Sequence, residues 1–356
     1  MKVASASILI CTYNRARLLR ETLAALRAMT LPPDCQVEII VVDNNSSDNT
    51  QLVIAEAAAQ SAVPVIAVRE TRQGKSFALN HGLDVARGDV IALTDDDVWP
   101  QANWLAQIVA DFRQRDVTFV FGKVLPRWGR LPPPEMLTPA AQVIWGPLAI
   151  VDYGDEPTDY VADGVGRRLP IGANLAFARE ALVAIGGWRT DLGKVNNTLI
   201  SGEDHEIFLR LRRHGRFSGY YDPAVSVQHF VPAARLTRQY FRRWFFWHGK
   251  TQALMFDDLY PEIDVSRVPR IAGVPRFLYR QSLEQIWLWL RSLGNSDALK
   301  VLTEELYALQ YAGMAYEFWR RRNHPLVSEV LQVKTAPESV SAAPARPSPS
   351  MTALTD

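Results

Sequence analysis

Four short apolar runs alternate with stretches of helical periodicity over the first hundred residues of this chain. The apolar runs cover residues 7–12, 37–43, 65–68 and 90–94, and the helical stretches between them cover residues 16–29, 49–60 and 76–86. Nearly continuous apolar strands separated by amphipathic helices are typical of a parallel sheet that helices cover on both faces. The sequence therefore predicts an α/β fold with a mostly parallel central sheet flanked by helices.

Polar clusters follow three of these predicted strands, at the edge of the sheet where ligands of such folds bind. They comprise residues 12–15, 43–48 and 95–97. Neither the glycine fingerprint of a dinucleotide site nor a Gly-Lys-Ser/Thr phosphate loop follows the first strand. We therefore expect a ligand site at this edge that uses neither glycine-rich loop.

Three consecutive aspartates end the fourth predicted strand. In an extended chain Asp95 and Asp97 share one face, while Asp96 points the other way. Clustered carboxylates near a buried strand need a counter-charge or they become protonated. Mg²⁺ or Mn²⁺ supplies that charge, and such an ion binds one or two protein carboxylates together with substrate phosphates. The triplet predicts a metal–phosphate site, and the simpler alternative is that Asp97 caps a helix opened by Pro100.

Composition narrows the classes of protein that fit. The chain has 356 residues, 48% of them hydrophobic and 22% charged, as in ordinary globular proteins. A formal charge of +1 argues against a nucleic-acid partner, which normally requires a basic excess. Cys11 and Cys35 are the only cysteines, and neither a leader-like apolar segment nor an uncharged run of membrane-spanning length occurs. These features predict a cytoplasmic protein.

Two further residues are candidates for chemistry. Asp204 lies in the first turn of a helix predicted from about Glu203 to His214, on the same stripe as apolar residues that the helix buries. It is either a general base or an acid that only satisfies free backbone amides. His229 ends an alternating strand pattern, and imidazole is a ligand that suits Mn²⁺, although a lone histidine of this kind is more often structural.

The C-terminal third of the chain has helical character from residue 234, with a break around residues 257–275. Arg235, Arg238 and Arg242 recur at helical spacing, so they either clamp a diphosphate or form a solvated basic face. Tryptophans and arginines of residues 278–322 suit a membrane surface or a dimer contact, and core packing explains them equally well. The last residues are rich in Pro, Ala and Ser, which predicts a disordered tail.

Taken together, these motifs resemble the family-2 glycosyltransferases, which have the Rossmann-like GT-A fold and transfer sugars from nucleotide donors. The resemblance rests on residues 7–15, 41–48, 74–89, 94–97, 202–204 and 229–243, which occur in the family's order. It includes a DxD motif at residues 95–97 and covers roughly residues 5–250. It implies a catalytic domain at residues 1–232. The helical character and the composition of the remaining chain predict a C-terminal helical extension at residues 233–333 and a disordered tail at residues 334–356.

The resemblance also implies a role for individual residues. Asp204 would be the catalytic base, and Asp97 and His229 would hold Mn²⁺ or Mg²⁺ at the donor diphosphate. The residues expected to bind the donor nucleotide are Thr12, Tyr13, Asn14, Asp43, Arg72, Lys75, Asp95 and Asp96. Those expected at the diphosphate or the acceptor are Asn174, Glu203, Arg242 and Arg243.

Several residues depart from the family pattern. Asn44 and Asn45 replace the usual Asp-Gly after Asp43, which leaves the nucleobase open. Lys75 stands where the family commonly has an apolar residue, and Leu79 stands where it commonly has an arginine. We expect Lys75 to supply the positive charge that this arginine would provide. The Gln-x-x-Arg-Trp motif of processive synthases is out of register at residues 239–244. We therefore expect transfer of a single sugar.

The resulting expectation is a metal-dependent, inverting glycosyltransferase of polysaccharide or glycoconjugate synthesis, with a nucleotide-diphosphate-sugar donor and a saccharide or lipid-linked acceptor. Its alternatives are a nucleotidyltransferase and a non-catalytic module that binds nucleotide-sugars. The C-terminal helices would make any peripheral contact with the cytoplasmic face of the membrane, or any contact within a homodimer.

Overall fold

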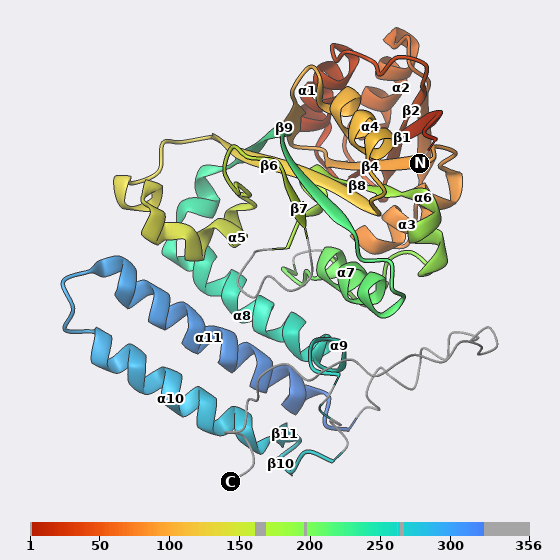
Figure 1. The fold of residues 1–356 in the computed structure, drawn as a ribbon. Coiled ribbons are helices and arrows are strands. Elements are labelled where there is room, and N and C mark those ends of the chain that lie inside the picture. Colours follow the sequence, from red (N-terminus) through yellow and green to blue (C-terminus); the bar gives the residue numbers. More distant parts are fainter. Residues whose placement is uncertain (1, 161–168, 196–197, 262, 264–266, 324–356) are drawn as a thin grey trace.

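The computed structural model describes residues 2–160, 169–195, 198–261, 263 and 267–323. In these residues a mixed sheet of nine strands is flanked by helices, and a group of long helices lies against one side of it (Figure 1). The strand order is β3-β2-β1-β4-β8-β6-β9-β5, and β7 pairs with β9. The predicted disordered tail at residues 334–356 lies outside the described residues.

The first half of the sheet is parallel, as the sequence predicts. Its strands are β1 (Ser5–Thr12), β2 (Gln36–Asp43), β3 (Val65–Arg69) and β4 (Val90–Asp95). They are connected by α1 (Ala16–Arg27), α2 (Thr50–Gln60) and α3 (Lys75–Val85). Ile8, Leu9 and Ile10 are all fully buried, so both faces of β1 are covered. The apolar stripe Leu19, Leu23 and Leu26 of α1 is buried too.

The second half of the sheet is mixed. Its strands are β5 (Val98–Pro100), β6 (Phe119–Trp128), β7 (Thr158–Tyr160), β8 (Leu175–Ala178) and β9 (Gly219–Val231). Strand β8 is antiparallel to β4 and β6, whereas β6 and β9 are parallel. The associated helices are α4 (Trp104–Gln114), α6 (Arg179–Ala184) and α7 (Glu203–Arg213), and the short turn η3 (Gly172–Asn174) precedes β8. These features confirm the predicted α/β fold class.

Pro100 and Pro126 lie in strands, and the first of them excludes the helix-cap alternative for Asp97. Pro100 ends strand β5 and the next helix begins at Trp104, so Asp97 does not cap a helix. Pro126 also lies in a strand, because β6 continues to Trp128. Beyond Phe121 this strand pairs with β9, and on its other edge only Val124 is paired, with Val151. That edge has no ladder bond at Pro126, so the missing amide of the proline is tolerated there. The chain then forms η1 (Pro134–Leu137), η2 (Pro139–Ile144) and α5 (Trp145–Leu148).

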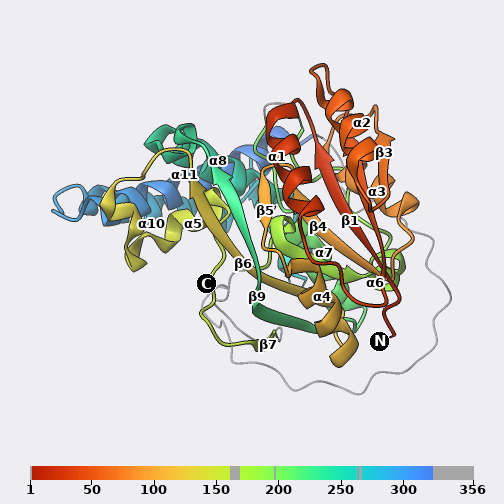
Figure 2. The same cartoon turned by 90° about the horizontal axis from the view of Figure 1, so that it is seen from above.

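The C-terminal region is helical with a break, as predicted. It comprises η4 (Ala233–Leu236), α8 (Arg238–Leu254), α9 (Phe256–Leu259), a hairpin of β10 (Arg270–Ile271) and β11 (Val274–Pro275), α10 (Arg276–Ser292) and α11 (Ala298–Arg320). Helix α11 packs between α8 and α10, and the three extend to one side of the sheet (Figures 1 and 2). A Cβ at Gly249 of α8 would lie 1.8 Å from the Gln310 carbonyl oxygen of α11, so this crossing requires glycine.

The helices of the described residues include none that combines the length and the apolar character of a membrane span.

Candidate active site

The polar residues predicted at the strand ends do converge. In the parallel half, Thr12 of β1 lies beside Asp43 of β2, and Cys11 lies beside Asp95 of β4. Antiparallel strand β8 brings η3 to the same edge, where Thr94 Oγ1 donates to the Ala173 carbonyl oxygen over 3.2 Å. A cavity of about 630 Å³ opens there. The predicted site residues that line it are Thr12, Tyr13, Lys75, Asp95, Asp96, Asp97, Glu203, Asp204 and His229.

The aspartate triplet does not alternate as expected. Strand β4 ends at Asp95, and the chain turns at the next two residues before β5. Asp96 and Asp97 therefore do not face opposite ways, because one nitrogen of Arg15, Nη1, lies 2.9 Å from Asp96 Oδ1 and 2.7 Å from Asp97 Oδ2. Arg15 is the counter-charge that the clustered carboxylates require.

The carboxyl groups of Asp95 and Asp96 ionise in different environments. Burial raises the pKa of Asp96 to about 6, although Arg15 and a 2.7 Å hydrogen bond from Thr12 Oγ1 oppose it. Burial also disfavours ionisation of Asp95, but the surrounding cations, led by Lys75, whose Nζ lies 3.3 Å away, together outweigh it and lower the pKa of Asp95 to about 2. Asp95 is therefore an anion that a fixed cation neutralises.

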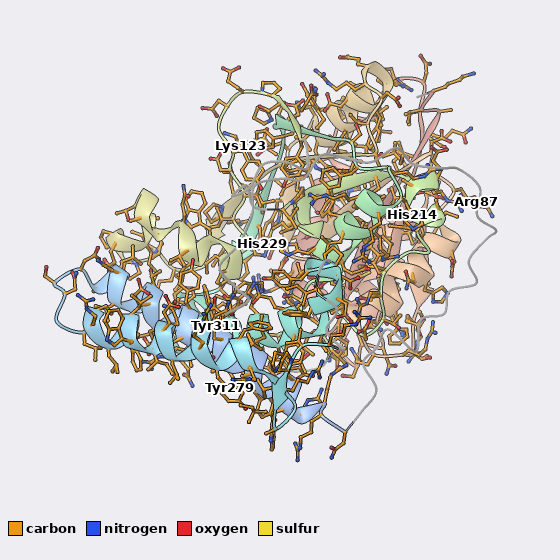
Figure 3. All side chains as sticks on the ribbon, turned by 60° about the horizontal axis from the view of Figure 1, so that its bottom comes forward. Arg87, Lys123, His214, His229, Tyr279 and Tyr311 are labelled. Carbon is orange, nitrogen blue, oxygen red and sulfur yellow. The ribbon has the colours of Figure 1, made fainter. Side chains whose placement is uncertain are left out.

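His229 lies beside Asp97 because β9 pairs with β5, where Val98 is opposite His229. Its Nε2 is 3.6 Å from Asp97 Oδ1 and 3.4 Å from Arg235 Nη1. Burial lowers the pKa of His229 to about 4, so the imidazole is neutral near pH 7. Neutral imidazole is the form that binds metal ions. Figure 3 places His229 between the sheet and the C-terminal helices.

Asp204 and Glu203 approach the cavity from the start of α7. Asp204 Oδ2 accepts a 2.8 Å hydrogen bond from the Gly172 amide, while its Oδ1 is buried with no hydrogen-bond partner among the described residues. Glu203 Oε1 lies 3.5 Å from Lys75 Nζ. Burial and the neighbouring Asp204 raise the pKa of Glu203. The available oxygen of Asp204 can accept a proton from a bound hydroxyl group.

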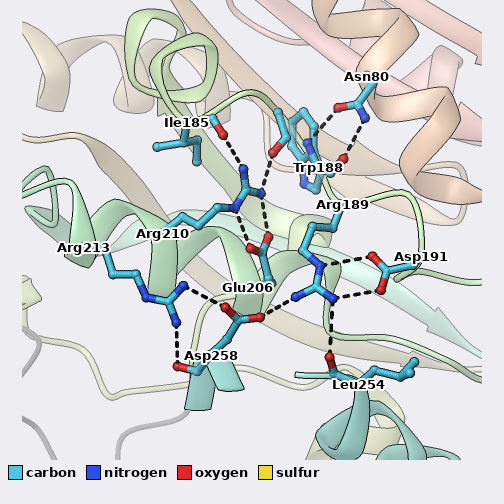
Figure 4. Close-up of polar contacts among 11 residues, drawn as sticks. Asn80, Ile185, Trp188, Arg189, Asp191, Glu206, Arg210, Arg213, Leu254 and Asp258 are labelled. Carbon is cyan, nitrogen blue, oxygen red and sulfur yellow. Dashed lines mark hydrogen bonds and ion pairs between the residues drawn. The ribbon is translucent and has the colours of Figure 1, made fainter. Parts of the chain in front are cut away.

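A network of ion pairs fixes α7 behind these carboxylates (Figure 4). Arg210 of α7 pairs with Glu206 over 2.5 Å and donates to the carbonyl oxygens of Ile185 and Gly187. Arg213 pairs with Asp258 of α9 over 2.8 Å, and this same carboxylate also binds Arg189. Because the helix is tied at several points, Asp204 is held at a defined position against Gly172.

Cations gather opposite the carboxylates. Lys75 contacts both Asp95 and Glu203, and Lys194 and Arg235 also line the cavity. Of these three cations, Lys75 was predicted from sequence to lie in the site, Arg235 was predicted there only as one of two alternatives, and Lys194 was not predicted. Arg15 could have been found, because it is the one basic residue of the first polar cluster and the triplet needs a counter-charge. Lys194 lies in an irregular loop that carries no periodic signal.

Six predicted site residues do not line the cavity: Asn14, Asp43, Arg72, Asn174, Arg242 and Arg243. Asn174 instead accepts from Trp104 Nε1 and donates to two backbone carbonyls, so it links three elements of the core. Arg242 is exposed and pairs with Glu305 of α11 over 2.5 Å. Arg72 pairs with Glu70 over 2.8 Å. Asp43 accepts from the Ser46 amide and so shapes the loop after β2, while its neighbour Asn44 lines the cavity.

The donor set fits a metal ion that a substrate completes. Among the described residues, no group of three or more His, Cys, Asp or Glu side chains is arranged to hold a metal ion by itself. Asp97 Oδ1 and His229 Nε2 are nevertheless 3.6 Å apart, and Arg15 engages the other oxygen of Asp97. One carboxylate and one neutral imidazole, completed by substrate phosphate oxygens, form a ligand set that suits a divalent ion such as Mn²⁺.

Comparison with known proteins shows which family and which fold this chain resembles. Residues 7–139 match the sequence model of the family described as glycosyl transferase family 2. The fold is similar to that of a mannosyltransferase from Pyrobaculum calidifontis in complex with GDP-Man and Mn²⁺, with a TM-score of 0.54 and 18% identity over 91% of this chain and 88% of that one. The resemblance to the family and the GT-A fold are thus confirmed.

Two curated relatives in sequence also have names that describe sugar transferases. A glucosyl-dolichyl phosphate glucuronosyltransferase of Haloferax volcanii is 22% identical over 84% of this chain and 97% of its own length. An undecaprenyl-phosphate 4-deoxy-4-formamido-L-arabinose transferase of Pseudomonas savastanoi is 31% identical over 42% of this chain, which spans 44% of that relative. These comparisons support a glycosyltransferase activity.

Proposed function

We propose that this protein is a metal-assisted, inverting glycosyltransferase that moves one sugar from a nucleotide-diphosphate-sugar to a hydroxyl group of a lipid-linked saccharide. The observation that carries the proposal is the position of two separate carboxylate groups on one cavity. The triplet at the end of β4 and Asp204 at the start of α7 both face it. This separation fits a cavity in which the triplet lies in a donor half, the side that binds the sugar donor, and Asp204 lies in an acceptor half, the side that binds the acceptor.

The donor half combines aromatic, acidic and basic residues. Tyr13 is 41% exposed at the cavity, which leaves its ring available to stack on a nucleobase. Lys75, Lys194 and Arg235 supply positive charge for a diphosphate. Asp97 and His229 would hold the metal ion. That ion, when bound, stabilises the negative charge of the leaving diphosphate.

The acceptor half is where Asp204 would act as the general base. Its Oδ1 takes the proton of the acceptor hydroxyl while the acceptor oxygen bonds to the anomeric carbon. The bond from that carbon to the diphosphate breaks, and its electron pair leaves with the nucleoside diphosphate. A single displacement of this kind inverts the anomeric configuration. The cations around the cavity stabilise the charge that develops on the leaving group.

The remaining cavity wall supports a lipid-linked acceptor. It is mostly apolar and aromatic and comes from the segment after β6, from η3 and from α8. Its members include Pro147, Ile150, Ile171, Tyr240, Trp244 and Phe245. Such a wall suits the faces of sugar rings or an isoprenoid chain. Relatives whose names include dolichyl phosphate and undecaprenyl phosphate agree with this choice.

The test begins with the donor. Calorimetry of the whole chain against a panel of nucleotide-diphosphate-sugars, with Mn²⁺ and with EDTA, should identify one donor whose binding requires the metal. Asp97→Ala should remove the Mn²⁺-dependent part of that binding. Asp84→Ala, on the exposed surface of α3, is the matched control and should bind as the wild type does. Tight donor binding that is equal in Mn²⁺ and EDTA would contradict the assigned metal role.

A further inference from the structure

Helix α10 carries a continuous exposed apolar stripe along its whole length. Tyr279, Leu283, Ile286, Leu290 and Leu293 recur at intervals of three and four residues, so they lie on one face of the helix. They are between 39% and 67% exposed. Ile271 of the adjoining hairpin, whose carbonyl oxygen accepts a hydrogen bond from the Tyr279 hydroxyl, extends the stripe and is 56% exposed.

This stripe is not the face by which α10 joins the protein. A different face packs on α11, with Leu278 and Ser292 buried and Gln285 Nε2 donating to Glu304 Oε2 over 2.6 Å. Trp289 belongs to this inner side, because its indole nitrogen is buried. From sequence, a surface role and core packing were equally open for the tryptophans of this region. Trp289 packs inward, whereas Trp287 is 52% exposed. In Figure 3, Tyr279 lies at the outer edge of the helical layer.

Arginines border the stripe. Arg276, Arg280 and Arg291 are exposed on its margin, whereas Glu284 is the one acid of α10. Within the described residues none of these three arginines is part of an ion pair, and Arg291 lies over the ring of Trp287 at 4.5 Å. A half-exposed Trp next to an Arg is the combination found where proteins meet lipid headgroups.

We propose that the outer face of α10, with the tip of the β10–β11 hairpin, docks on an anionic lipid membrane, lying in its headgroup region. The apolar side chains would enter the interface while the arginines meet the lipid phosphates. A second copy of this chain fits the face less well. In an antiparallel two-fold contact along α10, Arg276 and Arg280 of one copy would meet Arg291 of the other, which places like charges together.

The proposal stands apart from the proposed activity, because α11 separates this face from the cavity. Tyr307 and Gln310 of α11 line the cavity, while α10 packs on the far side of that helix. A change in the stripe is therefore expected to leave donor binding unchanged. Membrane binding and donor binding can thus fail independently of each other.

Vesicle flotation of the full chain provides the test. The wild type should float with vesicles prepared from phosphatidylcholine with about 30% phosphatidylglycerol. Its affinity for them should be roughly a hundredfold higher than for phosphatidylcholine alone, because each of the three arginines near an anionic surface raises the affinity about fivefold. Leu283→Glu/Leu290→Glu should abolish flotation. Leu52→Glu, at a residue of α2 that is 56% exposed, is the matched control and should float normally.

A charge series completes the experiment. Arg280→Gln/Arg291→Gln should weaken binding to the anionic vesicles by roughly 20- to 30-fold, while Arg87→Gln/Arg130→Gln, at exposed residues elsewhere, should not. Circular dichroism confirms that each variant is folded. Flotation that survives Leu283→Glu/Leu290→Glu would overturn the proposal. The proposal would also be overturned if the wild type bound neither kind of vesicle. The same holds if the wild type formed a dimer that Leu283→Glu/Leu290→Glu dissociates.

Discussion

The carboxyl group of Asp111 provides a quantitative test of the electrostatics in this fold. Asp111 of α4 is 4% exposed and shares a site with Asp222 of β9, and Gln107 Nε2 donates to Asp222 Oδ2 over 2.8 Å. Burial, followed by the charge of Asp222, raises the pKa of Asp111 from 3.8 to about 7. The folded protein therefore holds a proton on this group that the unfolded chain releases at lower pH.

The sign and size of the effect follow from this difference. A carboxyl group whose pKa is higher in the folded state destabilises that state when it ionises, so the free energy of unfolding falls as pH rises from about 4 to about 7. Roughly three pH units at 1.36 kcal/mol each amount to about 4 kcal/mol near pH 8 as an upper value. At pH 5 the same relation leaves a cost of about 1.5 to 2 kcal/mol.

Replacing Asp111 with Asn removes the ionisation and keeps the shape of the side chain. Urea unfolding followed by circular dichroism should show Asp111→Asn to be more stable than the wild type, with a gain at pH 8 that exceeds the gain at pH 5 by about 2 to 3 kcal/mol. Asp116→Asn, at an exposed residue just beyond the same helix, should change little at either pH. An equal gain at both pH values, or no gain, would refute the reasoning.

Two further predictions concern the cavity. Lys75→Met leaves Asp95 and Glu203 without their shared cation, so donor affinity should fall by about ten- to a hundredfold in calorimetry, because a charge-assisted contact contributes roughly 1.5–3 kcal/mol; an unchanged affinity would remove Lys75 from the donor site. Gly172→Ala introduces a Cβ 3.0 Å from Asp204 Oδ1. It should lower the transfer rate by more than about tenfold with little change in donor affinity, since small displacements of a catalytic group are costly, and full activity would show that Asp204 tolerates displacement.

The sheet edge was predictable from sequence because the apolar periodicity of the first hundred residues is strong. Strands β1 and β2 end at Thr12 and Asp43, as predicted. Because the carboxyl ends of neighbouring parallel strands lie at the same edge of a sheet, correct strand ends are enough to bring the polar residues that follow them together. The prolines were harder to interpret. Pro126 lies in a strand because one edge of β6 is unpaired there, and only the tertiary arrangement supplies that information.

The residues of the candidate site likewise fall into those that local sequence patterns predict and those whose position depends on tertiary contacts. Asp95, Asp97, Asp204 and His229 carry local signals, since each lies at the end of a recognisable strand or the start of a helix, and the structure brings them to one cavity. The partners of a side chain are not encoded locally. Arg242 follows the helical basic pattern yet is paired with Glu305, a residue of α11 some sixty positions later in the sequence.

The central claim is that Asp204 removes the proton from the acceptor, and one comparison of variants tests it directly. With the identified donor and acceptor, the rate of glycoside formation by Asp204→Asn should fall by about a hundred- to ten-thousandfold, the range typical of a lost general base. Its donor affinity, measured by calorimetry, should stay within about threefold of the wild type. That difference corresponds to less than 1 kcal/mol of binding free energy. Asp84→Asn controls for the change of charge and should transfer normally. Transfer by Asp204→Asn at a rate near that of the wild type would contradict the account.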